Sequence, residues 1–196
     1  MAVFQAFKAL RPTSEKAAAV AALPYDVVNR EEARQIGEKN QLSFLHVDRA
    51  EMDLEPDIDL YDKRVYDKAR ENLQNMEKEG ILIQDDTPCY YIYELVRKGR
   101  TQSGIVGCSS IDDYMNGIVK KHELTREDKE QDRIHHVDSC NANTGPIFLA
   151  CRYPQSLLAL MEQWKAEHPA AYDFTEEDEV AHRVWVIDAP EVTAKI

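Results

Sequence analysis

The sequence lacks several features that would identify large classes of protein. Its 196 residues include four cysteines, and no two of them form a Cys-x-x-Cys motif, so we do not expect a zinc site built from cysteines. No apolar run approaches the roughly 18 to 20 residues that span a bilayer, and the N-terminal residues lack the apolar core of a signal peptide. These absences predict a cytoplasmic protein without a membrane-spanning segment, whose cysteines are buried free thiols.

Two further absences concern nucleotides and nucleic acids. The chain has no Walker loop, no dinucleotide-binding Gly-x-Gly-x-x-Gly and no kinase catalytic loop. Basic residues are also few, since 24 Lys and Arg are set against 36 Asp and Glu, for a net charge of -12. This balance opposes loose binding to DNA, but it leaves room for a local basic pocket that binds one nucleotide.

Hydrophobic residues make up 43% of the chain, enough to build a core. Their patterns predict an α+β fold of one domain over residues 1–196, with a mixed sheet, a central antiparallel hairpin and flanking helices. We expect the hairpin from residues 90–96 and 101–109, further strands at 42–47, 147–151 and 182–187, an acidic loop at 48–60, and helices at 29–39, 61–79, 125–140 and 155–166. Asn29 and Glu32 predict a capping box at the first of these helices, and the second has an apolar stripe of Val65, Ala69, Leu73 and Met76.

The segment from Lys120 to Pro146 is especially rich in polar, titratable residues. It lies between two predicted strands, where α+β proteins often place a ligand site. We expect Thr125 to cap a helix in this segment, with Asp128 as its partner three residues further on. The start of a helix offers free N–H groups and the positive end of a dipole, and both suit a phosphate.

Basic residues surround this predicted helix start. Lys121 and His122 precede it, and four further side chains follow at helical spacing in one stripe: Arg126, Lys129, Arg133 and His136. The stripe and the helix start together predict an anion-binding site. The alternative is a solvated helix held by pairs of opposite charge, because residues 120–136 contain five Lys or Arg and five Asp or Glu.

Four other candidates each have a structural alternative. Asp26 lies in a tight turn, where a carboxylate serves either as a general base or as an acceptor for local backbone N–H groups. Glu123 is either a metal ligand or catalytic carboxylate, or one half of a surface ion pair. Arg11 either clamps an anion or pairs with a neighbouring acid. Asn143 either lines a pocket or belongs to the turn that ends the helix.

Several motifs, in this order, resemble a bacterial and archaeal family labelled as a domain of unknown function (number ten-fifteen). The resemblance covers essentially the whole chain, and the motifs are Phe7 to Pro12, Pro24 to Val28, Asn40 to Leu45, Gly104 to Gly107, Lys121 to Thr125 and Asn141 to Phe148. Members of that family are usually about twice as long, so the resemblance implies an N-terminal portion or a short member.

That family is distantly similar to the ParB/sulfiredoxin-like superfamily, which includes ParB-type CTP-binding clamps, sulfiredoxins and free-serine kinases. Residues 122–128 resemble the ParB box Glu-Asn-Leu-Gln-Arg-Glu-Asp, with Glu123 in place of a metal-binding asparagine and Arg126 on an arginine of the box. The ParB Gly-Glu-Arg-Arg motif and the sulfiredoxin cysteine motif are absent, which argues against a CTP clamp and a sulfinic-acid reductase. In the kinases an acidic residue near the N-terminal strand acts as the base, and Asp26 is the candidate by position.

The resemblance therefore implies a nucleotide-binding protein, and specifically a kinase that phosphorylates a small hydroxyl compound such as free serine, using ATP or ADP with Mg²⁺. We expect catalysis from Asp26 and Glu123, metal binding from Glu123, and phosphate binding from Arg11, Lys121, His122, Thr125, Arg126, Arg133 and Asn143. Two alternatives remain: a non-catalytic ParB-like nucleotide-binding regulatory module, and an interaction domain without a ligand. The phosphate acceptor and the oligomeric state do not follow from the sequence.

Overall fold

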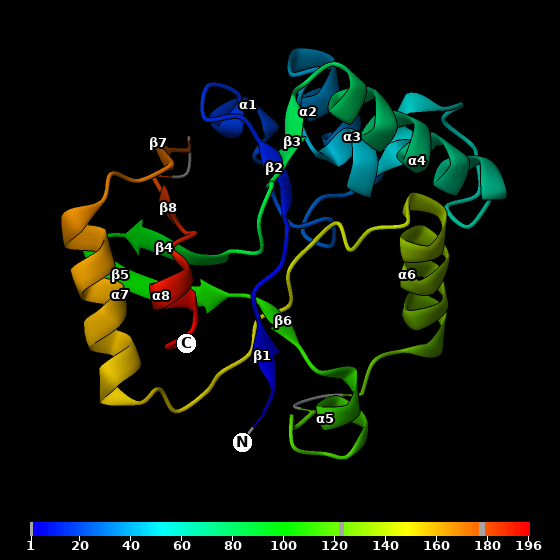
Figure 1. Ribbon diagram of the computed structural model, residues 1–196. Coiled ribbons are helices and arrows are strands. Elements are labelled where there is room, and N and C mark those ends of the chain that lie inside the picture. The colour runs from blue at the N-terminus through cyan, green and yellow to red at the C-terminus, as the bar shows by residue number, and fades with distance from the viewer. Residues whose placement is uncertain (1, 122–123, 177–178) are drawn as a thin grey trace. The chain divides into compact units, whose positions relative to one another are not determined.

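The computed structural model describes residues 2–121, 124–176 and 179–196. The chain forms two compact units, each assembled from separate stretches of sequence (Figure 1). Unit 1 comprises Met1–Ser14, Gln84–His122 and Ile147–Ile196, and unit 2 comprises Glu15–Ile83 and Glu123–Pro146. Helices and strands occur together, so the predicted α+β class is confirmed. The prediction of one domain over residues 1–196 stays a prediction.

A four-stranded sheet in the order β5-β4-β8-β7 organises unit 1. Its strands are β4 (Tyr90–Arg97), β5 (Arg100–Val106), β7 (Tyr172–Thr175) and β8 (Ala181–Ile187). The predicted hairpin of β4 and β5 is confirmed, and it turns at Lys98 and Gly99, which both have positive φ as a tight two-residue turn requires. All three pairings are antiparallel, so the expectation of a mixed sheet is wrong here. Short connections account for the β4–β5 and β7–β8 pairs, whereas β4 and β8 are distant in sequence and are paired only by the fold.

Helix α7 (Gln155–Glu167) supplies the apolar cover of this sheet, close to its predicted bounds. Met161 and Trp164 on one side of the helix are buried in a cluster with Ile92, Trp185 and Ile187. The three sheet residues share one face, since Ile92 is paired with Trp185 and side chains alternate along a strand. This cluster is the core of unit 1.

Unit 1 also holds short elements: β1 (Phe4–Gln5), β2 (Leu10–Pro12), β6 (Cys108–Ser109), α5 (Ile111–Met115) and α8 (Pro190–Thr193). β1 pairs antiparallel with β6, and β3 (Leu82–Gln84) crosses the boundary between the units.

Two expectations about unit 1 are wrong. Residues 147–151 form no strand, because no described strand pairs with them. As a consequence the Cys151 side chain is exposed. Cys108, on the short strand β6, is exposed too, so the prediction of buried thiols is confirmed only for Cys89 and Cys140.

Unit 2 is helical. Its elements are α1 (Ala17–Val20), α2 (Arg30–Lys39), α3 (Leu45–Asp48), a 3₁₀-helix (Ala50–Asp53), α4 (Lys63–Lys78) and α6 (Glu127–Cys140). α2 begins at the predicted capping box, in which Asn29 accepts from the backbone N–H of Glu32 and Glu32 accepts from that of Asn29. α4 buries the predicted apolar stripe and ends before Gly80, which has positive φ.

The strand expected at residues 42–47 is instead the start of α3. Ser43 begins the turn, since its buried hydroxyl accepts a hydrogen bond from the N–H of Leu45 at 3.3 Å. Leu45 and Val47 are then buried by the helices around them. A short apolar run fits a buried helix as well as a strand, so periodicity alone could not separate the two.

Candidate functional site

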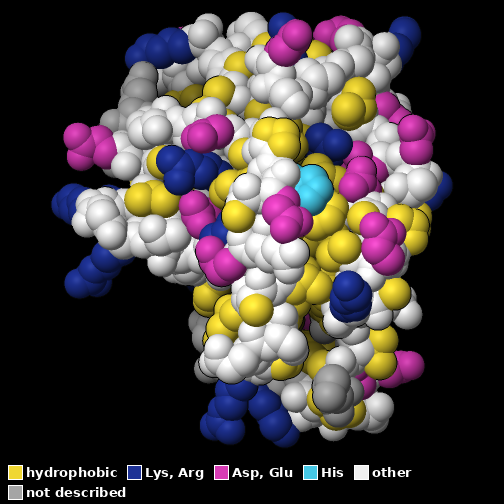
Figure 2. Space-filling view, turned by 60° about the vertical axis from the view of Figure 1, so that its left-hand side comes forward, with side chains coloured by type: hydrophobic (Ala, Val, Ile, Leu, Met, Phe, Trp, Pro, Cys, Tyr) yellow, Lys and Arg dark blue, Asp and Glu magenta, His cyan; other side chains and the backbone are white. Residues whose placement is uncertain are grey.

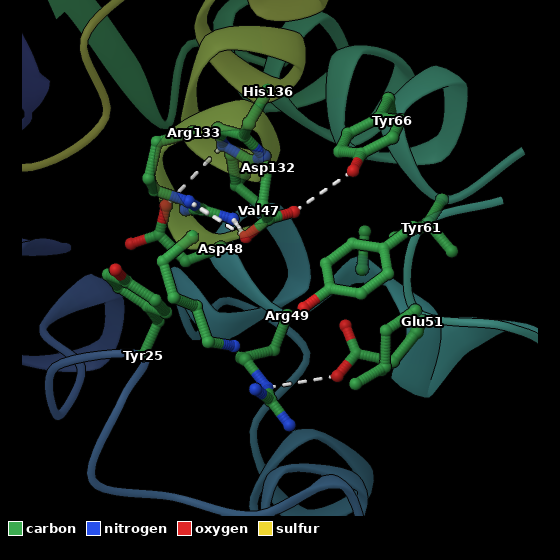
Figure 3. A pocket seen from close by; sticks show the side chains of 14 residues that line it. Tyr25, Val47, Asp48, Arg49, Glu51, Tyr61, Tyr66, Asp132, Arg133 and His136 are labelled. Atoms are coloured by element: carbon green, nitrogen blue, oxygen red, sulfur yellow. Dashed lines mark hydrogen bonds and ion pairs between the residues drawn. The ribbon is translucent and has the colours of Figure 1, made fainter. Parts of the chain in front are cut away.

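A hollow in unit 2 gathers charged and aromatic side chains from α3, the 3₁₀-helix, α4 and α6 (Figure 3). The empty volume of the hollow, including the part open to solvent, is about 440 Å³. Its polar and aromatic lining residues are Tyr25, Asp48, Arg49, Glu51, Tyr61, Tyr66, Lys129, Asp132, Arg133 and His136. We call this hollow the unit 2 pocket.

One face of α6 forms a wall of the unit 2 pocket. Lys129, Asp132, Arg133 and His136 all line it, and residues at these spacings share one side of a helix. Three of these four belong to the basic stripe expected from the sequence. The fourth member of that stripe, Arg126, does not line the pocket.

Arg133 is held in place by a carboxylate and an aromatic ring. Its guanidinium donates to Asp132 at 2.9 Å, and its central carbon lies 4.3 Å from the centre of the Tyr25 ring. Asp132 also accepts a hydrogen bond from the Tyr66 hydroxyl at 3.0 Å. Burial and this hydrogen bond raise the pKa of Tyr66 well above its usual value, so the phenol stays protonated. The orientation of Arg133 is therefore set before any ligand arrives.

Arg49 and Glu51 face each other on another side of the pocket, with 2.9 Å between the Arg49 Nε and a Glu51 oxygen. Among the described residues, neither of these two buried atoms has a hydrogen-bond partner of good geometry. The two side chains therefore attract each other by charge, but the Arg49 Nε and the Glu51 oxygen form no hydrogen bond.

A polar cluster at the pocket wall joins two of the lining residues, Asp48 and His136, to Thr144. The Thr144 hydroxyl donates to Asp48 at 2.6 Å and lies 3.3 Å from the His136 Nε2. Burial lowers the pKa of His136 to about 4, and the charge of Arg133 acts in the same direction. Burial also raises the pKa of Asp48, against the effect of Thr144. His136 is consequently neutral at pH 7, so its 3.6 Å contact with Asp48 is polar and not an ion pair.

Cys140 lies next to this cluster but is not arranged as a nucleophile. Its sulfur is 3.8 Å from the same His136 Nε2 that faces Asp48, whereas a catalytic triad uses the two ring nitrogens for different partners. Burial also raises the pKa of the thiol to about 11, so little thiolate forms at pH 7.

The predicted helix start differs from expectation. Thr125 is exposed and does not cap α6, since the N-cap residue is Arg126 and its side chain makes no capping bond. Arg126 pairs with Asp128 at 2.8 Å, so the expected capping partner of Thr125 is already engaged. The first turn of α6 is acidic, which disfavours a further anion there. Further along α6, Lys129 and Arg133 of the predicted basic stripe line the unit 2 pocket.

The other candidates of unit 2 lie outside the pocket. Asp26 is exposed in a turn, and its neighbour Tyr25 is the residue that lines the pocket. Asn143 is exposed after the end of α6, and its neighbour Thr144 is the residue that contacts Asp48. In both turns a neighbouring side chain makes the contact with the interior, and turn chemistry in the sequence does not reveal which of the two faces inward.

Two candidates belong to unit 1. Arg11 donates to both oxygens of Asp85 and to the Tyr172 hydroxyl, which matches its structural alternative. Lys121 is exposed, with its ammonium 4.8 Å from the centre of the Tyr114 ring. Neither is described as part of the unit 2 pocket.

The two remaining candidates, His122 and Glu123, lie outside the described residues, and with them the predicted metal ligand. Within residues 2–121, 124–176 and 179–196, no group of three or more His, Cys, Asp or Glu side chains could hold a metal ion.

Sequence reasoning missed Asp48, Arg49 and Glu51. They fall where we expected the end of a strand and an acidic loop. One signal was available, since Arg49 is the only Lys or Arg between Val47 and Asp62. A lone cation in an acidic stretch is a reasonable candidate for a specific ion pair.

Comparisons with known proteins agree with the resemblance seen in the motifs. Among the helices that the structure describes, none is both long and apolar enough to cross a membrane. No curated protein and no solved structure matches the chain. Residues 4–196 match the model of a family described as "Protein of unknown function (DUF1015)". The match covers nearly the whole sequence, so the chain belongs to the DUF1015 family.

Proposed function

We propose that this protein binds a nucleotide in the unit 2 pocket and transfers phosphate from it to a small hydroxyl compound such as free serine. The observation that carries this proposal is the presence of three cations, Arg49, Lys129 and Arg133, around one hollow. Lys129 is exposed and forms no ion pair with another described residue, so it is free to meet a phosphate. Phosphoryl transfer depends mainly on positioning and charge neutralisation, which such a set supplies.

Aromatic rings at the unit 2 pocket favour a nucleotide over a simple phosphate ion as its ligand. Tyr25 and Tyr61 stand on opposite sides of the hollow in Figure 3. A base that lies against either ring gains stacking energy, roughly 1–3 kcal/mol in single-strand binding proteins. The hollow is partly open to solvent, so the phosphates would lie among its cations while the base lies at the open side.

Carboxylates in the pocket could bind Mg²⁺ and accept the proton of the hydroxyl compound. Mg²⁺ is usually held by one or two carboxylates together with substrate phosphates. Asp48 and Glu51 line the pocket and are available for this role, with Glu123 as the candidate suggested by the resemblance. Asp48 also replaces Asp26 as the carboxylate best placed to accept a hydroxyl proton, since it lies in the pocket. The ParB/sulfiredoxin-like relation and a cytoplasmic location belong to the same proposal.

The second candidate is an interaction domain without a ligand. The observation in its favour is that Arg49 and Arg133 already have carboxylate partners, at 2.9 Å in each case. In this alternative the pocket residues form a structural network of ion pairs. A ParB-like regulatory module, which binds nucleotide without transfer, lies between the two.

The test is calorimetric titration of ATP, ADP, CTP and GTP with Mg²⁺ into the wild type, Arg133→Ala and Arg126→Ala. Both arginines lie at α6 and both pair with an aspartate, but only Arg133 lines the pocket. We expect Arg133→Ala to weaken nucleotide binding about tenfold or more, a loss of about 1.4 kcal/mol, and Arg126→Ala to leave it unchanged.

The other possible outcomes of these titrations distinguish the alternatives. Equal weakening in both variants would show that the nucleotide binds elsewhere. Nucleotide binding without phosphoserine in a ³¹P NMR assay with serine would favour the regulatory module. No heat and no thermal stabilisation with any nucleotide would favour the interaction domain, because a ligand that binds the folded state must stabilise it.

A further inference from the structure

Hydrophobic side chains reach the surface at many points of the face seen in Figure 2. One consecutive group of them lies in unit 1, where Ile147 is 79% exposed, Phe148 is 78% exposed and Leu149 is 41% exposed. Single exposed apolar residues are common, but a run of large ones side by side is typical of an interaction surface.

The backbone of this segment is also unpaired. Residues 147–152 have neither helical nor strand structure, and no backbone hydrogen bond joins them to another described residue. Ile147 and Phe148 are residue types that favour strands, and the pattern of the sequence predicts a strand there. The segment is therefore a strand-forming stretch that lacks a strand partner within the described parts of the chain.

We propose that this segment pairs with the same segment of a second copy of the chain, as two antiparallel strands related by a two-fold axis. Addition of a strand to an unpaired stretch is a common mode of association, since the backbone groups supply the hydrogen bonds. A two-fold axis makes such a contact close on itself and gives a dimer.

Charge favours a second copy at this place although the whole chain is acidic. None of the 36 acidic residues falls between Ser139 and Met161, and the only charged residue in that stretch is Arg152. Two copies that meet through this stretch avoid the repulsion that the net charge of -12 creates elsewhere.

The side chains of the segment also complement one another. With Leu149 on the axis, Phe148 lies opposite Ala150 of the second copy, so a large side chain meets a small one. Ile147 lies opposite Cys151, and Arg152 lies opposite Pro146, so no like charges face each other. This register brings the exposed apolar side chains of the two copies into cross-strand contact, and the backbone groups that face the partner form hydrogen bonds.

The test is sedimentation of the whole chain over a range of concentrations, with the variants Phe148→Asp and Ile111→Asp. Both residues are 78% exposed and lie in unit 1, so neither change disturbs a core, and circular dichroism checks the fold. We expect a dimer for the wild type and for Ile111→Asp, and a monomer for Phe148→Asp. A wild type that stays monomeric, or a dimer that persists in Phe148→Asp, overturns the proposal.

A cross-link tests the register. The variant Leu149→Cys is combined with Cys108→Ser and Cys151→Ser, which remove the two exposed native thiols. In the proposed register, the new thiol of one copy lies opposite the new thiol of the other copy at the two-fold axis. Opposite residues in antiparallel strands lie about 4.5–5.5 Å apart between Cα atoms, within the range that a disulfide spans. We expect a disulfide-linked dimer under mild oxidation, and its absence from a dimeric sample would overturn the antiparallel pairing.

Discussion

Arg11 shows how much its surroundings decide the role of a charged side chain. Burial by itself lowers the pKa of Arg11, but hydrogen bonds to Asp85 and Tyr172 outweigh it and raise the pKa further above the usual value. Tyr91 donates to the same carboxylate at 2.5 Å, so the groups form one connected network in unit 1. Each nitrogen of the Arg11 guanidinium already donates to Asp85 or Tyr172, which gives Arg11 a structural role.

Arg11→Ala should therefore reduce stability and leave nucleotide affinity unchanged. Removal of the guanidinium leaves the half-buried Asp85 carboxylate without its cation, which we expect to cost about 2–4 kcal/mol in the free energy of unfolding. Urea denaturation of this variant is compared with that of Arg126→Ala, whose exposed ion pair contributes below about 1 kcal/mol. Equal losses in the two variants would contradict the structural role of Arg11.

His136 makes stability depend on pH. Its folded pKa of about 4 lies below the ordinary value of 6.5, so between these values the unfolded chain binds a proton that the folded chain does not. Its contribution is fully present above pH 6.5 and is lost as the pH falls toward 4, with a slope of up to about 1.4 kcal/mol per pH unit. The raised pKa of Asp48 acts in the opposite sense above pH 3.8.

We predict that the variant His136→Gln, which cannot gain this charge, loses less stability than the wild type over the same acidic range. Denaturant unfolding at several pH values between 6.5 and 4 measures the difference. Parallel curves for the two proteins would show that His136 titrates normally in the folded state.

At the scale of helices and strands, two helix starts that look alike in the sequence differ in the structure. Asn29 caps α2 with two reciprocal hydrogen bonds to Glu32, of 3.0 Å and 2.8 Å. Thr125 has the same kind of partner three residues on, Asp128, but that carboxylate pairs with Arg126 instead. α6 begins one residue later than the pattern predicts, with Arg126 as its N-cap, so Thr125 lies outside the capping position.

Asn29→Ala should accordingly cost about 1 kcal/mol in stability, the usual loss for a cap residue. Thr125→Ala should cost almost nothing, because the side chain is exposed and makes no capping bond. The two variants are compared by thermal unfolding under identical conditions. A loss of stability in Thr125→Ala as large as that in Asn29→Ala would show that Thr125 does cap α6.

At the scale of the whole molecule, charge sets the class of partner. The chain carries 36 acidic and 24 basic residues, and many of the described basic side chains are in ion pairs. Because acidic residues outnumber basic ones by 36 to 24, a phosphate backbone meets net repulsion from the chain.

We therefore predict no binding to duplex DNA in fluorescence anisotropy, even at low salt, where such binding is strongest. The nucleotide titration in the same buffer serves as the positive control. An anisotropy rise that disappears as salt is added would contradict this prediction.

Sequence alone determined the elements whose signals are local. The β4–β5 hairpin with its Lys98-Gly99 turn, the capping box of α2 and the stripe of α4 each depend on residues a few positions apart. The α+β class followed from the same kind of pattern, whereas the DUF1015 family followed from a resemblance in motifs along the whole chain. Local backbone preference and side-chain periodicity are enough to specify such features.

Only the tertiary structure decided the composition of the unit 2 pocket. It brings Tyr25, Arg49, Tyr61 and Arg133 together from separate segments, whereas Arg126 and Asp26, which seemed equally suitable, stay outside. It also decided that residues 147–151 stay unpaired and that Arg11 is held by Asp85. The reason is physical: burial and charge partners arise from packing between residues distant in sequence, and these contacts leave no periodic trace in the chain.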